Sequence, residues 1–141
     1  MAILLDQTTH QALLDNRNIL VVDDEESIRR LLAYLLQSHG YTVDCAADAR
    51  EARQKLSDQP FALMLCDVNM PGESGMDLVR SLLSDQNHTA AIMVTGLDSS
   101  VLANAALDGG AFGYIVKPFE SNEVLIDVAN ALRRRRLEME N

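Results

Sequence analysis

The segment LMLCDVNMPG, residues 63–72, decides the fold. An apolar run, LMLC, leads directly into Asp67, and a Met-Pro-Gly turn follows two residues later. A short, fully apolar run of this kind is typical of a strand that is buried in a parallel sheet. Because a carboxylate is costly to remove from water, we expect Asp67 to lie at the end of the sheet and not inside it.

Four further apolar runs of similar length flank this one, with segments of helical period between them. Alternation of this kind is typical of repeated strand–helix units and predicts a parallel sheet covered by helices on both faces. The fold class is therefore α/β. The five predicted strands are Ile19–Val22, Thr42–Ala46, Ala62–Cys66, Ala91–Val94 and Phe112–Val116.

Helix boundaries follow from capping residues. Gly40 is expected to end the first helix in a left-handed conformation, and Asp48 with Glu51 forms a predicted capping box for the second. Predicted N-caps of the later helices are Ser74, Asp98 or Ser99, and Ser121. The inward-facing residues predicted for the first and last helices are Ile28, Leu31, Leu32, Leu35 and Leu36, and Val124, Leu125, Val128, Ala129 and Leu132.

Composition narrows the class of protein. The chain has 141 residues, of which 48% are hydrophobic, enough for one domain but not for two. Its net charge of −9 argues against nucleic-acid binding, and no apolar run is long enough to span a membrane. We expect a cytoplasmic protein with an N-terminal extension over residues 1–17, one domain over 18–135, and a tail or linker over 136–141.

Polar side chains follow four of the predicted strands. Asp23 and Asp24 come after the first, Asp67 after the third, Thr95 after the fourth and Lys117 after the fifth. Ligands of open parallel sheets gather at the carboxyl ends of the strands, so these groups should form one site. Crowded carboxylates that are open to water suit Mg²⁺, and a carboxylate can act as a nucleophile that forms an aspartyl phosphate. Asp67 is the predicted nucleophile.

The ordered motifs VVDDEESIRRLL, LMLCDVNMPGESG, MVTG and GYIVKPF resemble the receiver domain of two-component response regulators from about Asn18 to Arg135. The resemblance implies a flavodoxin-like (βα)5 fold with sheet order 2-1-3-4-5. It also implies that Asp67 accepts a phosphoryl group from a phosphohistidine of a sensor histidine kinase or phosphotransfer protein. A homodimer through the face of the fourth helix, fifth strand and fifth helix is a further expectation of the resemblance. The chain is either a stand-alone receiver or the receiver of a longer regulator with an output domain after Asn141, and we favour the second.

The resemblance also implies roles for the surrounding residues. Asp24 would bind Mg²⁺ directly, Asp23 largely through water, and Asn69 through its backbone carbonyl. Thr95 and Lys117 would hold the phosphoryl oxygens, and the Lys117–Pro118 bond is usually cis in this family. Tyr114 matches the switch aromatic, through which the face of the fourth helix, fifth strand and fifth helix would change.

Other classes of protein fit these residues less well. Hydrolases of the haloacid dehalogenase type use a second Asp where this chain has Asn69, which cannot transfer a proton. A flavodoxin would need a phosphate-binding loop in place of the acidic run after the first strand. A pseudo-receiver that only binds partners is the remaining alternative. Asn69 and Leu97, each two residues beyond a site residue, are expected to give the phosphoryl group a long lifetime.

Two minor features have simple interpretations. Cys45 and Cys66 lie in strands that a third strand should separate, so we expect two buried free thiols and no disulfide. The four arginines at 133–136 are typical of a solvated helix end, favoured by the helix dipole. A nucleic-acid patch suits so acidic a chain less well, and a third interpretation is a helix that continues toward an output domain.

Overall fold

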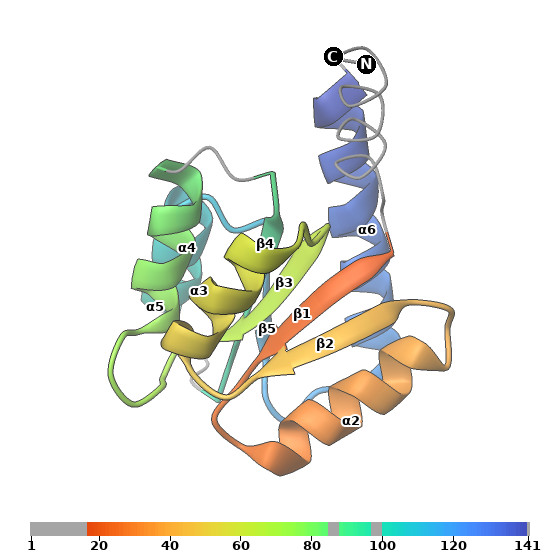
Figure 1. Cartoon of the computed structure of the whole chain (residues 1–141), viewed down its shortest axis with the longest axis horizontal. Helices are drawn as coiled ribbons and strands as arrows, with labels where there is room; N and C mark the ends of the chain where they lie inside the picture. Colours follow the sequence, from red (N-terminus) through yellow and green to blue (C-terminus); the bar gives the residue numbers. More distant parts are fainter. Residues whose placement is uncertain (1–16, 85–87, 97–99, 141) are drawn as a thin grey trace.

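The computed structural model describes residues 17–84, 88–96 and 100–140. Within these residues five strands alternate with five helices (Figure 1). Each predicted strand is present, and its ends lie within one residue of the prediction. The elements are β1 (Asn18–Val22), α2 (Glu26–Gln37), β2 (Thr42–Ala46), α3 (Ala49–Asp58), β3 (Leu63–Asp67), α4 (Gly75–Ser84), β4 (Ala90–Thr95), α5 (Ser100–Asp108), β5 (Gly113–Val116) and α6 (Ser121–Glu140).

The five strands form one parallel sheet in the order β2-β1-β3-β4-β5, which confirms the expected topology. Helices α3, α4 and α5 cover one face, and α2 and α6 cover the other (Figure 1). The result is a three-layer α/β sandwich of the flavodoxin-like type.

Each face of the sheet has its own hydrophobic core. In β3, Met64 and Cys66 face α3, α4 and α5, whereas Leu63 and Leu65 face α2 and α6. All four side chains are almost completely buried. Burying one side chain of this size contributes about 1.5–3 kcal/mol, so the two aliphatic layers supply most of the driving force for folding.

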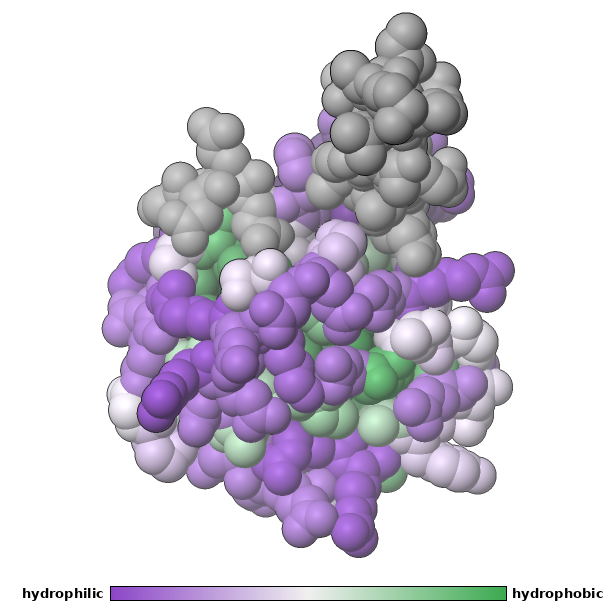
Figure 2. All heavy atoms as spheres, viewed as in Figure 1, coloured by the Kyte–Doolittle hydropathy of each residue, from purple (hydrophilic) through white to green (hydrophobic). Residues whose placement is uncertain are grey.

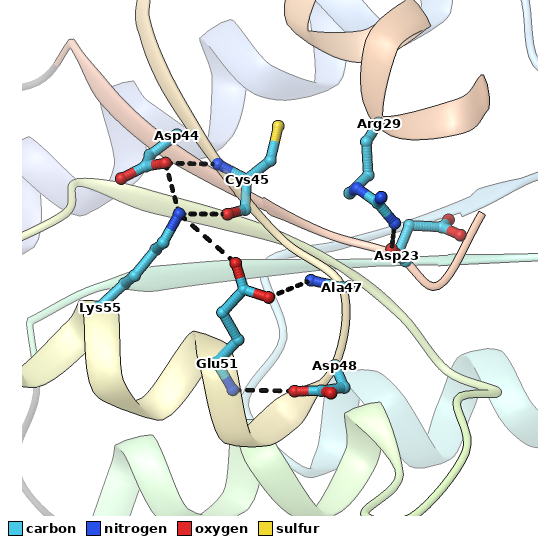
Figure 3. A network of polar contacts seen from close by, with 8 residues as sticks. All are labelled: Asp23, Arg29, Asp44, Cys45, Ala47, Asp48, Glu51 and Lys55. Atoms are coloured by element: carbon cyan, nitrogen blue, oxygen red, sulfur yellow. Dashed lines mark hydrogen bonds and ion pairs between the residues drawn. The ribbon is translucent and has the colours of Figure 1, made fainter. Parts of the chain in front are cut away.

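Several predicted helix ends are confirmed. Asp48 Oδ1 accepts a hydrogen bond from the Glu51 amide at 2.8 Å, and Glu51 Oε2 accepts one from the Ala47 amide at 3.2 Å (Figure 3). Ser74 Oγ accepts from the Asp77 amide at 3.2 Å, and Gly40 has a φ of +89° after α2. Capping therefore fixes where α3 and α4 begin and where α2 ends.

Three details of the helix prediction were wrong. Ser121 is the first residue of α6 and not its cap, since the Val124 amide bonds to the carbonyl of Glu120. Leu31 is 52% exposed, because it lies at the margin of the apolar stripe of α2. Ala129 is exposed, and Ala131 is buried in its place. The predicted caps Asp98 and Ser99 lie outside the described residues.

The arginine run also differs from the expected solvated helix end. Arg135 is only 3% exposed, and its Nε donates to the carbonyl of His88 at 2.8 Å. The guanidinium of Arg134 lies 4.0 Å from the centre of the Phe112 ring. The helical period places Arg135 below Val128 and Leu132 on the buried face of α6, which explains why it cannot reach solvent.

Hydrophilic side chains cover most of the face in Figure 2, and no helix among the described residues is long and apolar enough to cross a membrane.

Cys45 and Cys66 are free thiols on β2 and β3, with β1 between them. Cys66 is buried, but Cys45 is only half-buried, contrary to expectation, because β2 is an edge strand.

Candidate functional site

The predicted site residues meet at one edge of the sheet. Asp23 follows β1, Asp67 ends β3, Thr95 ends β4 and Lys117 follows β5. Because all these strands are parallel, their carboxyl ends share an edge. Asp23, Asp67 and Thr95 are 1%, 6% and 0% exposed, so three polar residues are buried where the strands end.

Lys117 joins the two buried carboxylates. Its Nζ donates to Asp23 Oδ2 at 2.7 Å and lies 3.5 Å from Asp67 Oδ2. Burial alone would lower the pKa of Lys117, but the hydrogen bond to Asp23 and the charges of Asp23 and Asp67 raise it above the ordinary value. The ammonium is therefore charged at neutral pH and offsets part of the negative charge around it.

Asp67 is held by the turn that follows it. Its Oδ1 accepts a hydrogen bond from the Asn69 amide at 3.1 Å. Burial raises the pKa of Asp67, and the charges of Asp23 and Asp24 add to that effect, although the Asn69 amide and Lys117 oppose it. The net pKa is higher than that of an ordinary aspartate. An added positive charge would stabilise the ionised form of this carboxylate.

An acidic turn forms the outer part of the site. Carboxylate oxygens of Asp23, Asp24 and Glu25 lie within 4.8 Å of one another, and the latter two residues are exposed. Oxygen ligands that remain open to water suit Mg²⁺. The donor set therefore fits this ion. Glu25 was not predicted, although the run of four acidic residues at 23–26 was a signal that could have included it.

Thr95 and Tyr114 lie on the neighbouring strands β4 and β5. The Lys117 amide donates to the carbonyl of Thr95 at 2.6 Å, which ties the end of β5 to the end of β4. Tyr114 pairs with Met93 in the sheet register and packs, half-buried, against the core beneath α3, α4 and α5. The Lys117–Pro118 peptide bond is cis, as the resemblance implied.

Gly75 is a further residue of the site that the sequence did not single out. A Cβ atom at this position would lie 2.1 Å from the carbonyl oxygen of Asp67. The Gly75 amide also donates to the carbonyl of Val68 at 3.1 Å. Glycine thus lets the first turn of α4 approach the backbone of Asp67. A glycine before a helix was visible in the sequence, but this close approach was not.

The sequence predicts that Asn69 and Leu97 influence the lifetime of the phosphoryl group. Asn69 is exposed beside Asp67, with its amide bonded to Asp67 Oδ1. Leu97 lies outside the described residues. Gly96, next to Thr95, is exposed, and a Cβ atom there would meet nothing within 4 Å. The approach beside Thr95 is therefore open at Gly96.

Comparison with known proteins identifies the family that this chain matches. The family model for the response regulator receiver domain matches residues 19–129. Response regulator MprA of Mycobacterium ulcerans is 41% identical over 121 residues, which are 85% of this chain and 52% of MprA. This chain spans about half the length of the curated relatives it matches.

Two solved structures show how far the likeness extends. A CheY-like receiver domain protein from Methanospirillum hungatei has a TM-score of 0.79 at 32% identity, covering 85% of this chain and 96% of that chain. TrrA from Thermotoga maritima has a TM-score of 0.73 at 32% identity, covering 80% and 96%. The buried carboxylates, the lysine that joins them and these matches all agree: the chain belongs to the response regulator receiver domain family, the signalling domains of two-component systems.

Proposed function

We propose that Asp67 is the phosphoacceptor of this domain and that a histidine kinase or phosphotransfer protein supplies the phosphoryl group from a phosphohistidine. The observation that supports this most strongly is the Lys117 ammonium, which lies between the buried carboxylates of Asp23 and Asp67. A carboxylate oxygen of Asp67 attacks phosphorus, the phosphorus–nitrogen bond breaks, and the imidazole keeps its electron pair. The Lys117 ammonium and the Thr95 hydroxyl then bind the phosphoryl oxygens.

We further assign a Mg²⁺ site to Asp23, Asp24, Asp67 and the backbone carbonyl of Asn69. When bound, the ion neutralises charge on the phosphoryl group and on the carboxylates. The acidic turn supports this assignment, and the TrrA structure is described as a complex with Mg²⁺ and BeF. With the ion present, the domain would catalyse its own phosphorylation and slow dephosphorylation.

The phosphorylated domain would change its surface through Thr95 and Tyr114. Thr95 is buried at the end of β4, and Tyr114 lies beside that strand with part of its surface exposed. Movement of Thr95 toward the phosphoryl group would let Tyr114 turn inward. We therefore place the change on the face of α5, β5 and α6, where a second copy of the chain or another partner would bind.

We also propose that this chain is part of a longer protein. Relatives of which the matched part of this chain covers only about half support an output domain beyond Asn141. We retain the predicted division into an extension at 1–17, the receiver at 18–135 and a tail or linker at 136–141, noting that α6 runs to Glu140. A cytoplasmic location also stays a prediction.

The direct test is labelling by acetyl phosphate in the presence of Mg²⁺, followed by mass spectrometry of the modified residue. The wild-type chain should gain one phosphoryl group, and Asp67→Asn should gain none. Asp77→Asn is the matched control, because Asp77 is exposed on α4 and paired with Arg80. Undiminished labelling of Asp67→Asn would overturn the assignment. A wild-type chain that neither labels nor binds beryllofluoride with Mg²⁺ would favour the binding-only pseudo-receiver.

A further inference from the structure

Arg29 makes a contact with the acidic turn that the proposed chemistry does not use. Its Nη1 donates to the backbone carbonyl oxygen of Asp23 at 2.7 Å, from the first part of α2 (Figure 3). Arg29 is half-buried, whereas the neighbouring Arg30 points to solvent and pairs with Glu26 at 3.0 Å. Two adjacent arginines thus have different surroundings.

This contact completes the set of bonds around Asp23. The Asp23 amide donates to the carbonyl of Ala46 at 3.1 Å, which ties it to β2. Its Oδ1 accepts from the Glu25 amide at 2.9 Å, and its Oδ2 accepts from Lys117. With Arg29 on the carbonyl oxygen, both backbone polar groups and both carboxylate oxygens of Asp23 have partners. The orientation of this residue is therefore fixed on every side.

The carbonyl group of Asp23 belongs to the peptide plane that leads into Asp24. A trans peptide is rigid and planar, so fixing its oxygen also fixes the direction in which the chain leaves toward Asp24. Asp24 itself is exposed. The direction in which the Asp24 side chain leaves the backbone therefore depends on the hydrogen bond from Arg29 to the Asp23 carbonyl.

We propose that Arg29 is a positioning residue for the metal site: it holds the Asp23–Asp24 peptide so that Asp24 presents its carboxylate to Mg²⁺. This inference rests on the proposed function, which assigns Asp24 as a metal ligand. Arginine suits the role because its planar guanidinium reaches a fixed carbonyl with defined geometry, whereas an ammonium on a flexible stem does not.

Charge and positioning predict opposite effects of removing this residue. A guanidinium beside an acidic turn repels a divalent cation, so loss of its charge alone would tighten Mg²⁺ binding. Loss of the bond to the Asp23 carbonyl would release the peptide and weaken binding. The sign of the change in Mg²⁺ affinity therefore separates the two roles.

The experiment is a Mg²⁺ titration of the full chain at constant ionic strength, followed by the NMR shifts of the Asp24 and Glu25 amides. Arg29→Gln should bind Mg²⁺ about tenfold more weakly than wild type, since loss of an outer-shell partner typically costs tenfold or more in metal affinity. Arg29→Lys, which keeps the charge, should also bind several-fold more weakly. Arg30→Gln is the matched control and should bind as wild type or slightly more tightly.

A second measurement uses the metal-free protein. Hydrogen exchange of the Glu25 amide, which donates to Asp23 Oδ1, should become faster in both Arg29 variants and stay unchanged in Arg30→Gln. Mg²⁺ affinity equal to or tighter than wild type in both Arg29 variants would overturn the inference; if Arg29→Gln does not fold, Arg29→Lys alone decides. A wild-type chain that binds no Mg²⁺ would instead refute the proposed function, and this inference with it.

Discussion

Lys117 and Asp23 are 94 positions apart in the sequence, yet the ammonium of one donates to a carboxylate oxygen of the other at 2.7 Å. The side chain of Lys117 is 15% exposed and that of Asp23 is 2% exposed. A buried ion pair contributes little net stability when intact, but removal of one partner leaves an uncompensated buried charge. The pair therefore makes the fold sensitive to the loss of the lysine.

Replacing Lys117 with Met should destabilise the metal-free domain by about 3 kcal/mol, because two buried carboxylates lose their cation. Urea unfolding at neutral pH measures the change. The same substitution in an Asp23→Asn background should cost clearly less, since one of the two buried charges is already absent. Equal costs in the two backgrounds would show that the pair is not energetically coupled.

The pH dependence of Lys117 has a definite sign. Its pKa is raised in the folded state, so the stabilisation it contributes is fully present below the unfolded value of 10.5. That stabilisation is lost as the pH rises through the folded value. The difference in unfolding free energy between wild type and Lys117→Met should therefore be constant near neutrality and shrink in strongly alkaline solution.

The carboxyl group of Asp67 behaves in the opposite sense. Its pKa is raised on folding, so the ionised form is penalised in the native state at neutral pH. Protonation removes that penalty as the pH falls toward the unfolded value of 3.8. Asp67→Asn should therefore be more stable than wild type at pH 7 without metal, with a gain that diminishes on acidification. Denaturant titrations across this range will test it, and a gain that grew on acidification would contradict it.

Gly75→Ala should destabilise the domain by about 1–3 kcal/mol, the usual cost of forcing an extra methyl group into a packed site. The new Cβ atom would meet the Asp67 carbonyl oxygen at 2.1 Å, so the start of α4 must move. Gly96→Ala is the control, because a Cβ atom there meets nothing within 4 Å. Thermal unfolding of the two variants gives the comparison, and equal midpoints would show that α4 adjusts freely.

Arg135→Met should cost about 1–3 kcal/mol, since the hydrogen bond from the buried guanidinium to the carbonyl of His88 is lost while the apolar stem is kept. Arg133→Met, at an exposed position of the same helix, should change stability by less than about 0.5 kcal/mol. Urea unfolding measures both variants. A similar small effect in both would mean that the run is a solvated helix end after all.

The sequence predicts the parts of this molecule that depend on local pattern. Apolar runs located every strand, and the polar residues that follow them, Asp23, Asp67, Thr95 and Lys117, located the site. The carboxyl ends of parallel strands share an edge, so residues that follow the strands in the sequence lie close together in the fold.

The features that the sequence did not predict depend on contacts between distant segments. Arg135 lies in a run of charge, and although the helical period places it on the inner face of α6, its hydrogen bond to the carbonyl of His88 depends on the fold. Gly75 and Arg29 act through backbone oxygens of Asp67 and Asp23, which carry no sequence signal at all. Leu31 is predicted to face inward because the helical period defines an apolar stripe, but the period does not show how wide the buried part of that stripe is.

The bond from Arg135 to His88 has a mechanical consequence for β4. At its end the carbonyl of Thr95 accepts from the Lys117 amide, and two residues before its start the carbonyl of His88 accepts from Arg135. The seven residue steps from His88 to Thr95 span about 23 Å of extended chain, which can hardly lengthen. A displacement of Thr95 along the strand axis would therefore reach the far half of α6 through the hydrogen bond between Arg135 and His88. The segment from His88 to Thr95 thus connects the acidic edge of the sheet with the last turns of the C-terminal helix.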